Sequence, residues 1–210
     1  MGRVLPILFN GEMVRAILED RKTVTRRTVK QSVWESFVCE GGKVVNWLNP
    51  ETDSLESPVY RAPYQPGDIM YVRETWAEWT DGYVYRTWIS PFPQAGCYPT
   101  TVWHPSIHMP KEAARIWLKV TYVRVERLQD IKNFQAEGIE LSEGCEECLA
   151  VCGECDPDEF PIGCDNEIEK FAELWDSAIK KPDIERYGWD ANPWVWVIEF
   201  ERCEKPEREG

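Results

Sequence analysis

Trp194-Val195-Trp196-Val197-Ile198-Glu199-Phe200, close to the end of the 210-residue chain, is the stretch that decides the fold. Successive side chains of a β-strand point to opposite faces, so the aromatic residues and Ile198 share one face and the two valines share the other. Both faces are apolar, and each must therefore be covered by another part of the chain. The sequence predicts the last strand of the fold over residues 193–202.

The elements around this strand follow from the hydrophobic pattern. We expect strands over residues 4–9, 43–47, 69–76, 83–89 and 116–125, and helices over residues 11–20, 130–137 and 166–179. Asn10 is a suitable N-cap for the first helix. The alternation of the strand at 116–125 changes phase near Tyr122, which predicts a bulge. Residues 49–65 are rich in Pro, Ser and Glu and are predicted to form an exposed loop.

Five or six strands interleaved with short helices are typical of an α+β fold, and we expect a partly closed β-barrel with peripheral helices. The predicted domain comprises residues 1–139 and 166–203. Residues 140–165 form an acidic, Cys-rich insertion, and residues 204–210 a disordered tail. The chain shows neither a membrane-spanning stretch nor a secretory signal and contains eight Cys, which together predict a reducing cytoplasmic environment.

A basic stretch, Arg21-Lys22-Thr23-Val24-Thr25-Arg26-Arg27, follows the first predicted helix, and we expect it to form a loop. Its cations and threonine hydroxyls are suitable donors for phosphate or carbonyl oxygens. A basic run at the C-terminal end of a helix also complements the helix macrodipole and needs no function for that. Both interpretations remain open from this stretch alone.

The strand at 69–76 places Arg73 on one face and Glu74 on the other, where Glu74 continues an apolar face. A carboxylate there must lie at the rim or pair with a cation, and Lys22 is the candidate partner. Such a pair can be purely structural. The functional alternative makes Lys22 a base with a burial-lowered pKa, Thr25 a nucleophile, and Glu74 the group that orients them or relays protons.

The cysteine cluster is the strongest metal signal in the chain. Two Cys-x-x-Cys pairs separated by three residues match the four-thiolate shell that Zn²⁺ prefers, and a fifth cysteine follows; the candidate ligands are Cys145, Cys148, Cys152, Cys155 and Cys164. We expect a structural zinc and no organic cofactor. An iron–sulfur cluster and free thiols are the alternatives, although the spacing does not match the common ferredoxin run.

The net charge of −13 is concentrated in one part of the chain. Residues 137–173 hold thirteen acidic residues and one lysine, whereas residues 1–136 hold seventeen basic and fifteen acidic residues. A long polyanion is repelled by the acidic segment. This distribution argues against non-specific DNA binding, and it is neutral toward a small nucleoside or a specific RNA loop.

Two further features are candidates for substrate contact. His104 and His108 have the spacing of a helical metal pair, but Pro105 and Pro110 argue against a regular helix there. We expect a substrate pocket between the basic stretch and the end of the strand at 69–76. These histidines are expected to form a loop wall of that pocket, with His108 as a substrate contact. Trp76, close to Glu74, is the tryptophan that we expect to stack on a base.

The chain resembles the ASCH domains of the PUA-like superfamily, especially their longer prophage-type members. The matching residues are Lys22-x-x-Thr25-x-Arg27, Pro66-Gly67-Asp68 leading into Val72-Arg73-Glu74-x-Trp76, Arg127-Leu128-x-Asp130-Ile131 through Glu137-Gly138, and Trp189-x-x-Asn192-Pro193-Trp194-Val195-Trp196-Val197. The family has RNA-related roles, and its small bacterial members include amidohydrolases that deacetylate N4-acetylcytidine. The resemblance implies a PUA-like barrel, a catalytic set of Lys22, Thr25 and Glu74, and a substrate contact at Arg27.

The sequence therefore predicts a hydrolase that cleaves an amide on a pyrimidine nucleoside. The first alternative is a non-catalytic module that binds RNA or a modified base through the same residues and Arg26, Arg73 and Trp76. The second is a phage–host interaction protein whose acidic insertion contacts a host protein. An enzyme requires a nucleoside-sized pocket at Lys22 and Thr25, whereas an RNA module requires a continuous basic groove.

Overall fold

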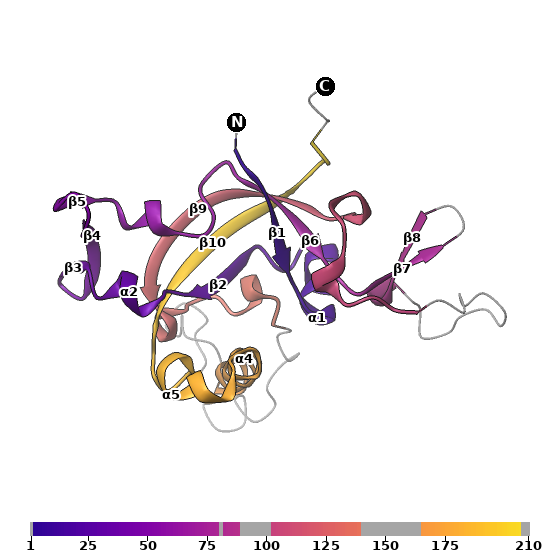
Figure 1. Cartoon of the computed structure of the whole chain (residues 1–210). Helices are drawn as coiled ribbons and strands as arrows, with labels where there is room; N and C mark the ends of the chain where they lie inside the picture. Colours follow the sequence, from indigo (N-terminus) through magenta and orange to yellow (C-terminus); the bar gives the residue numbers. More distant parts are fainter. Residues whose placement is uncertain (1, 80–81, 89–101, 140–164, 207–210) are drawn as a thin grey trace.

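The computed structural model of the chain describes residues 2–79, 82–88, 102–139 and 165–206. Its largest sheet has five strands in the order β1 (Val4–Leu8), β6 (Ile69–Arg73), β9 (Trp117–Arg127), β10 (Trp194–Cys203) and β2 (Val24–Thr28). β1 and β6 are parallel, and the other neighbours are antiparallel. The predicted α+β class is confirmed. The sheet is strongly curved (Figure 1), but within the described residues it does not close into a barrel, because β1 and β2 stay at its two edges.

β10 is covered on both faces, as its sequence predicts, and it lies between β9 and the edge strand β2. One face of β10 packs into a core with β1, β6 and α1, and the other packs against Leu128, Phe134 and Phe171. The predicted bulge is also present, because Glu199 pairs with Tyr122 while the next residue, Phe200, pairs with Val120. β9 therefore carries one extra residue at this point, which bends the strand pair.

Two small sheets flank the main one on opposite sides (Figure 1). The first consists of β3 (Phe37–Glu40), β4 (Lys43–Asn49) and β5 (Ser54–Glu56), and the second of β7 (Trp76–Trp79) and β8 (Gly82–Tyr85). The segment predicted to be an exposed loop at 49–65 therefore contains β5 and the 3-10 helix η1 (Pro58–Arg61). The strands predicted at 69–76 and 83–89 are shorter than expected, because β6 ends at Arg73 and β8 gives way to η2 (Arg86–Trp88).

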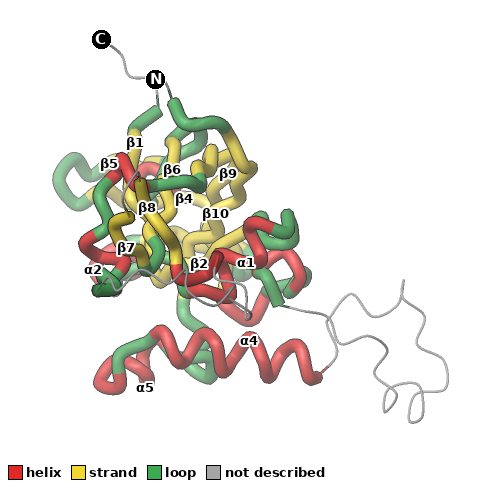
Figure 2. Tube along the Cα trace, turned by 90° about the vertical axis from the view of Figure 1, so that its right-hand side faces the viewer, coloured by secondary structure: helices red, strands yellow, loops and turns green. Residues whose placement is uncertain are grey.

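The helices occupy the ends and one side of the main sheet. α1 (Gly11–Leu18) begins where the Asn10 side chain accepts a hydrogen bond from the Met13 amide, which confirms the predicted cap. The remaining helices are α2 (Gln31–Trp34), α4 (Asp165–Ala178), α5 (Ile184–Tyr187), η3 (Ser106–His108), η4 (Lys111–Ala113), η5 (Leu128–Asp130), η6 (Gln135–Glu137) and η7 (Lys181–Asp183). The helix predicted at 130–137 is thus replaced by two short 3-10 turns. Figures 1 and 2 show α4 along one side of the sheet.

The predicted zinc ligands from Cys145 to Cys164 lie outside the described residues. Among the residues that are described, no cluster of His, Cys, Asp and Glu has the arrangement of a metal site. No helix in the described ranges is long and apolar enough to cross a membrane.

Candidate functional site

The basic stretch forms an edge strand of the main sheet rather than the loop that we expected. Thr25, Arg26 and Arg27 on β2 lie opposite Ile198, Val197 and Trp196 on β10. The amide of Thr23 donates a hydrogen bond to the carbonyl oxygen of Ala136, which joins this segment to η6. The strand thereby brings cationic side chains into the interior, where counter-charges from distant parts of the sequence meet them.

Lys22 is the most deeply buried of these cations, with its side chain fully shielded from solvent. Its Nζ donates to the carbonyl oxygens of Val24 and Glu137, each at 2.7 Å, and to Oε2 of Glu137 at 2.9 Å. Burial lowers the pKa of Lys22, although the Glu137 carboxylate opposes this shift. The ammonium group is therefore easier to deprotonate than that of a solvent-exposed lysine.

Glu137 is the carboxylate that binds both buried cations, and only 4% of the residue is exposed. One oxygen accepts from Lys22 and the other from Arg26, whose guanidinium also binds Glu126. Gly138, the next residue, has φ of +89°, and a Cβ there would lie 2.9 Å from Cβ of Ala16. Only glycine fits this turn without strain, so the Glu-Gly pair fixes the carboxylate against Lys22.

The Thr25 hydroxyl lies beside this ion-pair network. The residue is 1% exposed, and within the described part of the chain its hydroxyl makes no hydrogen bond. Thr25 lines a cavity of about 210 Å³ between β2 and α4, together with Glu137, Arg26 and Arg27. Aromatic and aliphatic residues of α4 form the opposite wall, so the cavity has one wall of polar residues and one apolar wall.

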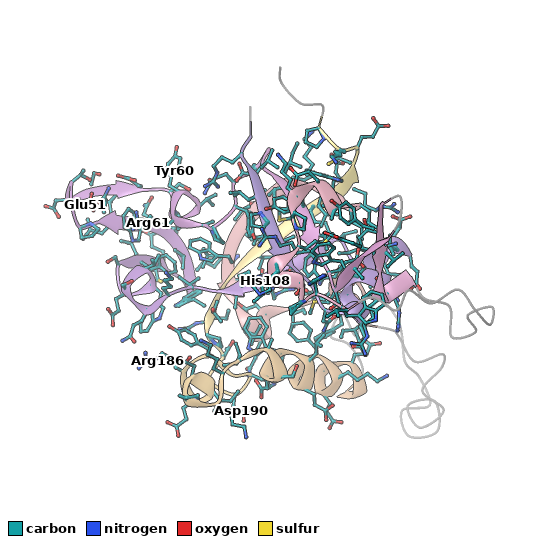
Figure 3. All side chains as sticks on the ribbon, turned by 45° about the vertical axis from the view of Figure 1, so that its right-hand side comes forward. Glu51, Tyr60, Arg61, His108, Arg186 and Asp190 are labelled. Carbon is teal, nitrogen blue, oxygen red and sulfur yellow. The ribbon has the colours of Figure 1, made fainter. Side chains whose placement is uncertain are left out.

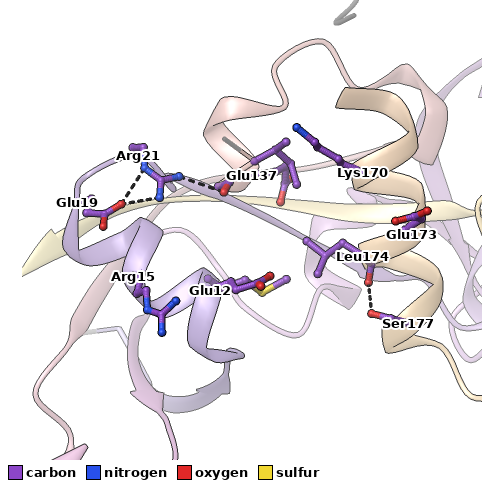
Figure 4. A pocket seen from close by; sticks show the side chains of 12 residues that line it. Glu12, Arg15, Glu19, Arg21, Glu137, Lys170, Glu173, Leu174 and Ser177 are labelled. Carbon is purple, nitrogen blue, oxygen red and sulfur yellow. Dashed lines mark hydrogen bonds and ion pairs between the residues drawn. The ribbon is translucent and has the colours of Figure 1, made fainter. Parts of the chain in front are cut away.

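A larger cavity of about 640 Å³ adjoins the first and shares Met13, Glu137 and Leu174 with it. It lies between α1 and α4 (Figure 4), and its lining carries charges of both signs. On the α1 side, Arg21 donates to Glu19 and to the carbonyl oxygen of Gly138. The two cavities together give Glu137 contact with an accessible space.

Arg27 contributes a positive charge whose hydrogen-bond partners are backbone carbonyl groups. Its guanidinium donates to the carbonyl oxygens of Arg26 and Leu8 and lies over the ring of Phe9, 5.5 Å from its centroid. Within the described residues it forms no salt bridge. Arg26, by contrast, is neutralised by two glutamates and is 6% exposed.

Glu74 does not join this site, contrary to our expectation that it pairs with Lys22. Its carboxylate receives two hydrogen bonds from Arg115, at 2.8 and 2.9 Å, and a third from the hydroxyl of Thr87. Glu74 is 2% exposed, and it lines none of the cavities described above. Arg115, 41 residues further along the chain, supplies the counter-charge that we had assigned to Lys22.

The other predicted substrate contacts are dispersed. Trp76 is 6% exposed and packs between Tyr83 and His104, with ring centroids 5.5 and 4.9 Å away. Its ring is therefore already covered within the protein, which leaves no open face for a base. His108 is exposed at the end of η3 (Figure 3) and lines none of the cavities described above, whereas Arg73 lines a third cavity, beside Arg27.

Sequence reasoning missed the central role of Glu137. The pair Glu137-Gly138 was among the residues that carry the resemblance, but it was given no chemical part. The signal that would have found it is the charge balance: two buried cations, Lys22 just before β2 and Arg26 on it, require a buried carboxylate from elsewhere in the chain. Glu126 was missed for the same reason.

Comparison with protein-family models, with curated proteins and with solved structures gave no match for this chain. The site is therefore defined by its own geometry. Glu137 pairs with the buried Lys22 and also lines a cavity together with Thr25, Arg26 and Arg27, whereas Lys22 itself lines none of the cavities described.

Proposed function

We propose that this chain hydrolyses an amide on a modified pyrimidine nucleoside of the N4-acetylcytidine type, as its resemblance to ASCH domains implies. The observation that carries the proposal is the buried Lys22–Glu137 pair, because Glu137 also lines a cavity together with Thr25. Glu137 takes the part that the resemblance implies for Glu74, because it is the carboxylate in contact with Lys22.

The roles follow from the chemistry of each group. Thr25 Oγ1 attacks the amide carbonyl carbon, and its proton passes to neutral Lys22, whose pKa burial lowers. The C–N bond then breaks, the departing amine takes that proton, and the acyl group remains on Thr25 as an ester. Water cleaves the ester through the same proton transfers, which releases a carboxylic acid and restores Thr25.

Glu137 and Arg27 support these steps without forming bonds to the substrate carbon. Glu137 holds the Lys22 amine by a hydrogen bond and stabilises the ammonium that forms during the transfer. Arg27 lines the same cavity, and we assign to it the substrate contact that the resemblance implies. The apolar wall from α4 lies opposite these polar groups and offers a surface for the face of the base.

The RNA-binding alternative draws less support from this geometry. A basic groove leading from Arg26 and Arg27 requires both guanidinium groups to be accessible, but Arg26 is buried between two glutamates. The host-interaction alternative depends on the acidic insertion, most of which lies outside the described residues.

The direct test is hydrolysis of N4-acetylcytidine, followed by chromatography. We expect Thr25→Val to lower kcat by about three orders of magnitude or more, because the nucleophile is removed while the shape of the side chain is kept. Thr23→Val is the matched control, since Thr23 is an exposed threonine two positions earlier on the same segment, and it should act like the wild type.

Two outcomes would count against the proposal. Wild-type protein that is folded yet releases no acetate from this substrate would exclude the activity and leave the RNA-binding alternative as the leading one. Full activity in Thr25→Val would remove Thr25 from the mechanism.

A further inference from the structure

A third cavity, of about 440 Å³, lies at the ends of β1 and β6 and the beginning of α1. Its described lining includes Arg27 and Arg73 and contains no Asp or Glu. The cavity between α1 and α4 differs sharply, because four glutamates line it. In a chain with a net charge of −13, a cavity lined by two arginines and no acid is a distinctive electrostatic feature.

Arg73 has only neutral partners within the described residues. It donates to the carbonyl oxygen of Ile107 and to the hydroxyl of Tyr71, both at 3.1 Å. Its Nε is buried and has no hydrogen-bond partner there. The protein thus positions this guanidinium firmly but leaves its charge uncompensated, which is costly unless a ligand compensates it.

Arg27 is held next to Arg73 by the pairing of two strands. It donates to the carbonyl oxygen of Leu8, and Leu8 on β1 lies opposite Arg73 on β6. The third polar group in the lining, Tyr64, donates its hydroxyl proton to the carbonyl oxygen of Pro6. Burial raises the pKa of Tyr64, so this phenol stays neutral and adds no negative charge.

Asn10 adds a further donor to the same cavity. Its side-chain oxygen is occupied as the cap of α1, which leaves the amide hydrogens available. Two guanidinium groups and an amide, with no acid beside them, suit the oxygens of a phosphate group.

The cavity of Thr25 and the arginine cavity share Met13, Arg27 and Ala178, so one ligand can extend from one into the other. We propose that the substrate is a nucleotide, whose acylated base lies beside Thr25 and whose 5′-monophosphate lies between Arg27 and Arg73. This inference rests on the proposed function. A longer polyanion fits less well, because Arg26 is neutralised and residues 137–173 are strongly acidic.

The test measures binding by titration calorimetry at one fixed low salt concentration, with cytidine, cytidine 5′-monophosphate and a cytidine-containing trinucleotide as probes. We expect the monophosphate to bind wild type about tenfold more tightly than cytidine, and Arg73→Gln to remove that difference while binding of cytidine is unchanged. Arg73→Lys, which keeps the charge but loses the planar fork, should retain part of it. The matched control is Arg186→Gln, an exposed arginine of α5 (Figure 3), which should behave as wild type.

Equal affinity of wild type for cytidine and its monophosphate would overturn the inference, as would a phosphate preference that survives in Arg73→Gln. Tighter binding of the trinucleotide than of the monophosphate would overturn the assignment to a mononucleotide.

Hydrolysis separates this inference from the proposed function. A protein that binds the monophosphate through Arg73 but hydrolyses neither N4-acetylcytidine nor its 5′-monophosphate retains the phosphate site and loses the hydrolase. Hydrolysis of both substrates with equal kcat/KM retains the hydrolase and removes the phosphate site.

Discussion

Glu137 and Glu74 are both almost fully buried and both bound by cations, yet their surroundings differ in the respect that matters for chemistry. Both oxygens of Glu74 are occupied by Arg115 and Thr87, and Glu74 lines none of the cavities described. Glu137 is shared by Lys22 and Arg26 and lines two cavities. Burial of a charged group therefore does not identify a site by itself, whereas burial together with access to a cavity does.

The cations differ as much as the carboxylates. Arginine stays protonated in proteins, so the Glu74–Arg115 pair has no proton to exchange at ordinary pH. Lysine can lose its proton when it is buried, and burial lowers the pKa of Lys22. The comparison thus divides the two clusters into a structural ion pair and a pair that is able to transfer protons.

Exchanging each carboxylate for its neutral amide is the most direct test of whether Glu137 or Glu74 supports catalysis. We expect Glu137→Gln to reduce hydrolysis of N4-acetylcytidine about a hundredfold or more, because the charge that stabilises protonated Lys22 is lost. Glu74→Gln should change kcat per folded molecule by no more than about threefold, since it touches no group at the reacting atoms. Turnover is measured by chromatography, with circular dichroism to establish the folded fraction.

The opposite ranking would return the catalytic role to Glu74. A loss of activity in Glu74→Gln alone, in protein that is as folded as Glu137→Gln, would mean that the pair with Arg115 rearranges when substrate binds.

The structural role of the Glu74 cluster predicts a second effect, on stability. Arg115→Met leaves the Glu74 carboxylate buried without its counter-charge, and such a loss costs about 3–5 kcal/mol in the free energy of unfolding. We expect the lower end of that range, because 22% of the Arg115 side chain is exposed. Urea unfolding measures the effect, and Lys119→Met serves as the control, because Lys119 and Glu201 form an exposed pair. Equal stability of the two variants would show that Glu74 is not held mainly by Arg115.

The hydrophobic pattern of the sequence predicted the strands and helices with apolar faces, and also local features such as a helix cap and a bulge. The alternation in β10, the cap at Asn10 and the bulge near Tyr122 are local properties, readable from a few neighbouring residues. β2 was missed because Arg26 and Lys22 have the character of a solvated segment. Their burial becomes favourable only through Glu126 and Glu137, which lie 100 and 115 residues from the cations that they bind.

The pairing of Glu74 shows the same limit. The sequence placed the carboxylate on an apolar face, either at the rim or paired with a cation, and offered Lys22 as the partner. The structure shows a pair, but its cation is Arg115, which meets Glu74 through the three-dimensional arrangement of segments 41 residues apart. Lys22 and Thr25 were nominated from the sequence and from the resemblance. The structure pairs Lys22 with Glu137 and places Thr25 in the lining of a cavity that Glu137 also lines.

The smallest expected effect is a change in pH dependence. If neutral Lys22 is the base, kcat/KM rises with pH through the lowered pKa of Lys22 and then levels off, so the rise is centred below the ordinary lysine value of about 10.4. Because the carboxylate of Glu137 raises the pKa of Lys22, the residual activity of Glu137→Gln should show this rise at lower pH, while Glu74→Gln keeps the wild-type profile.

The same lowered pKa affects stability, with a sign that can be worked out. At pH values between the folded and the unfolded pKa of Lys22, the unfolded chain binds more protons than the folded chain. The free energy of unfolding therefore increases with pH in that window, and below the window Lys22 contributes no pH dependence. Urea unfolding across this range should show the increase in wild type and not in Lys22→Met.

The kinetic prediction has its own contradicting outcome. A pH profile of kcat/KM that is identical in wild type and Glu137→Gln would mean that Lys22 does not titrate in the reaction. Glu137 and Glu74 would then differ only in their access to a cavity.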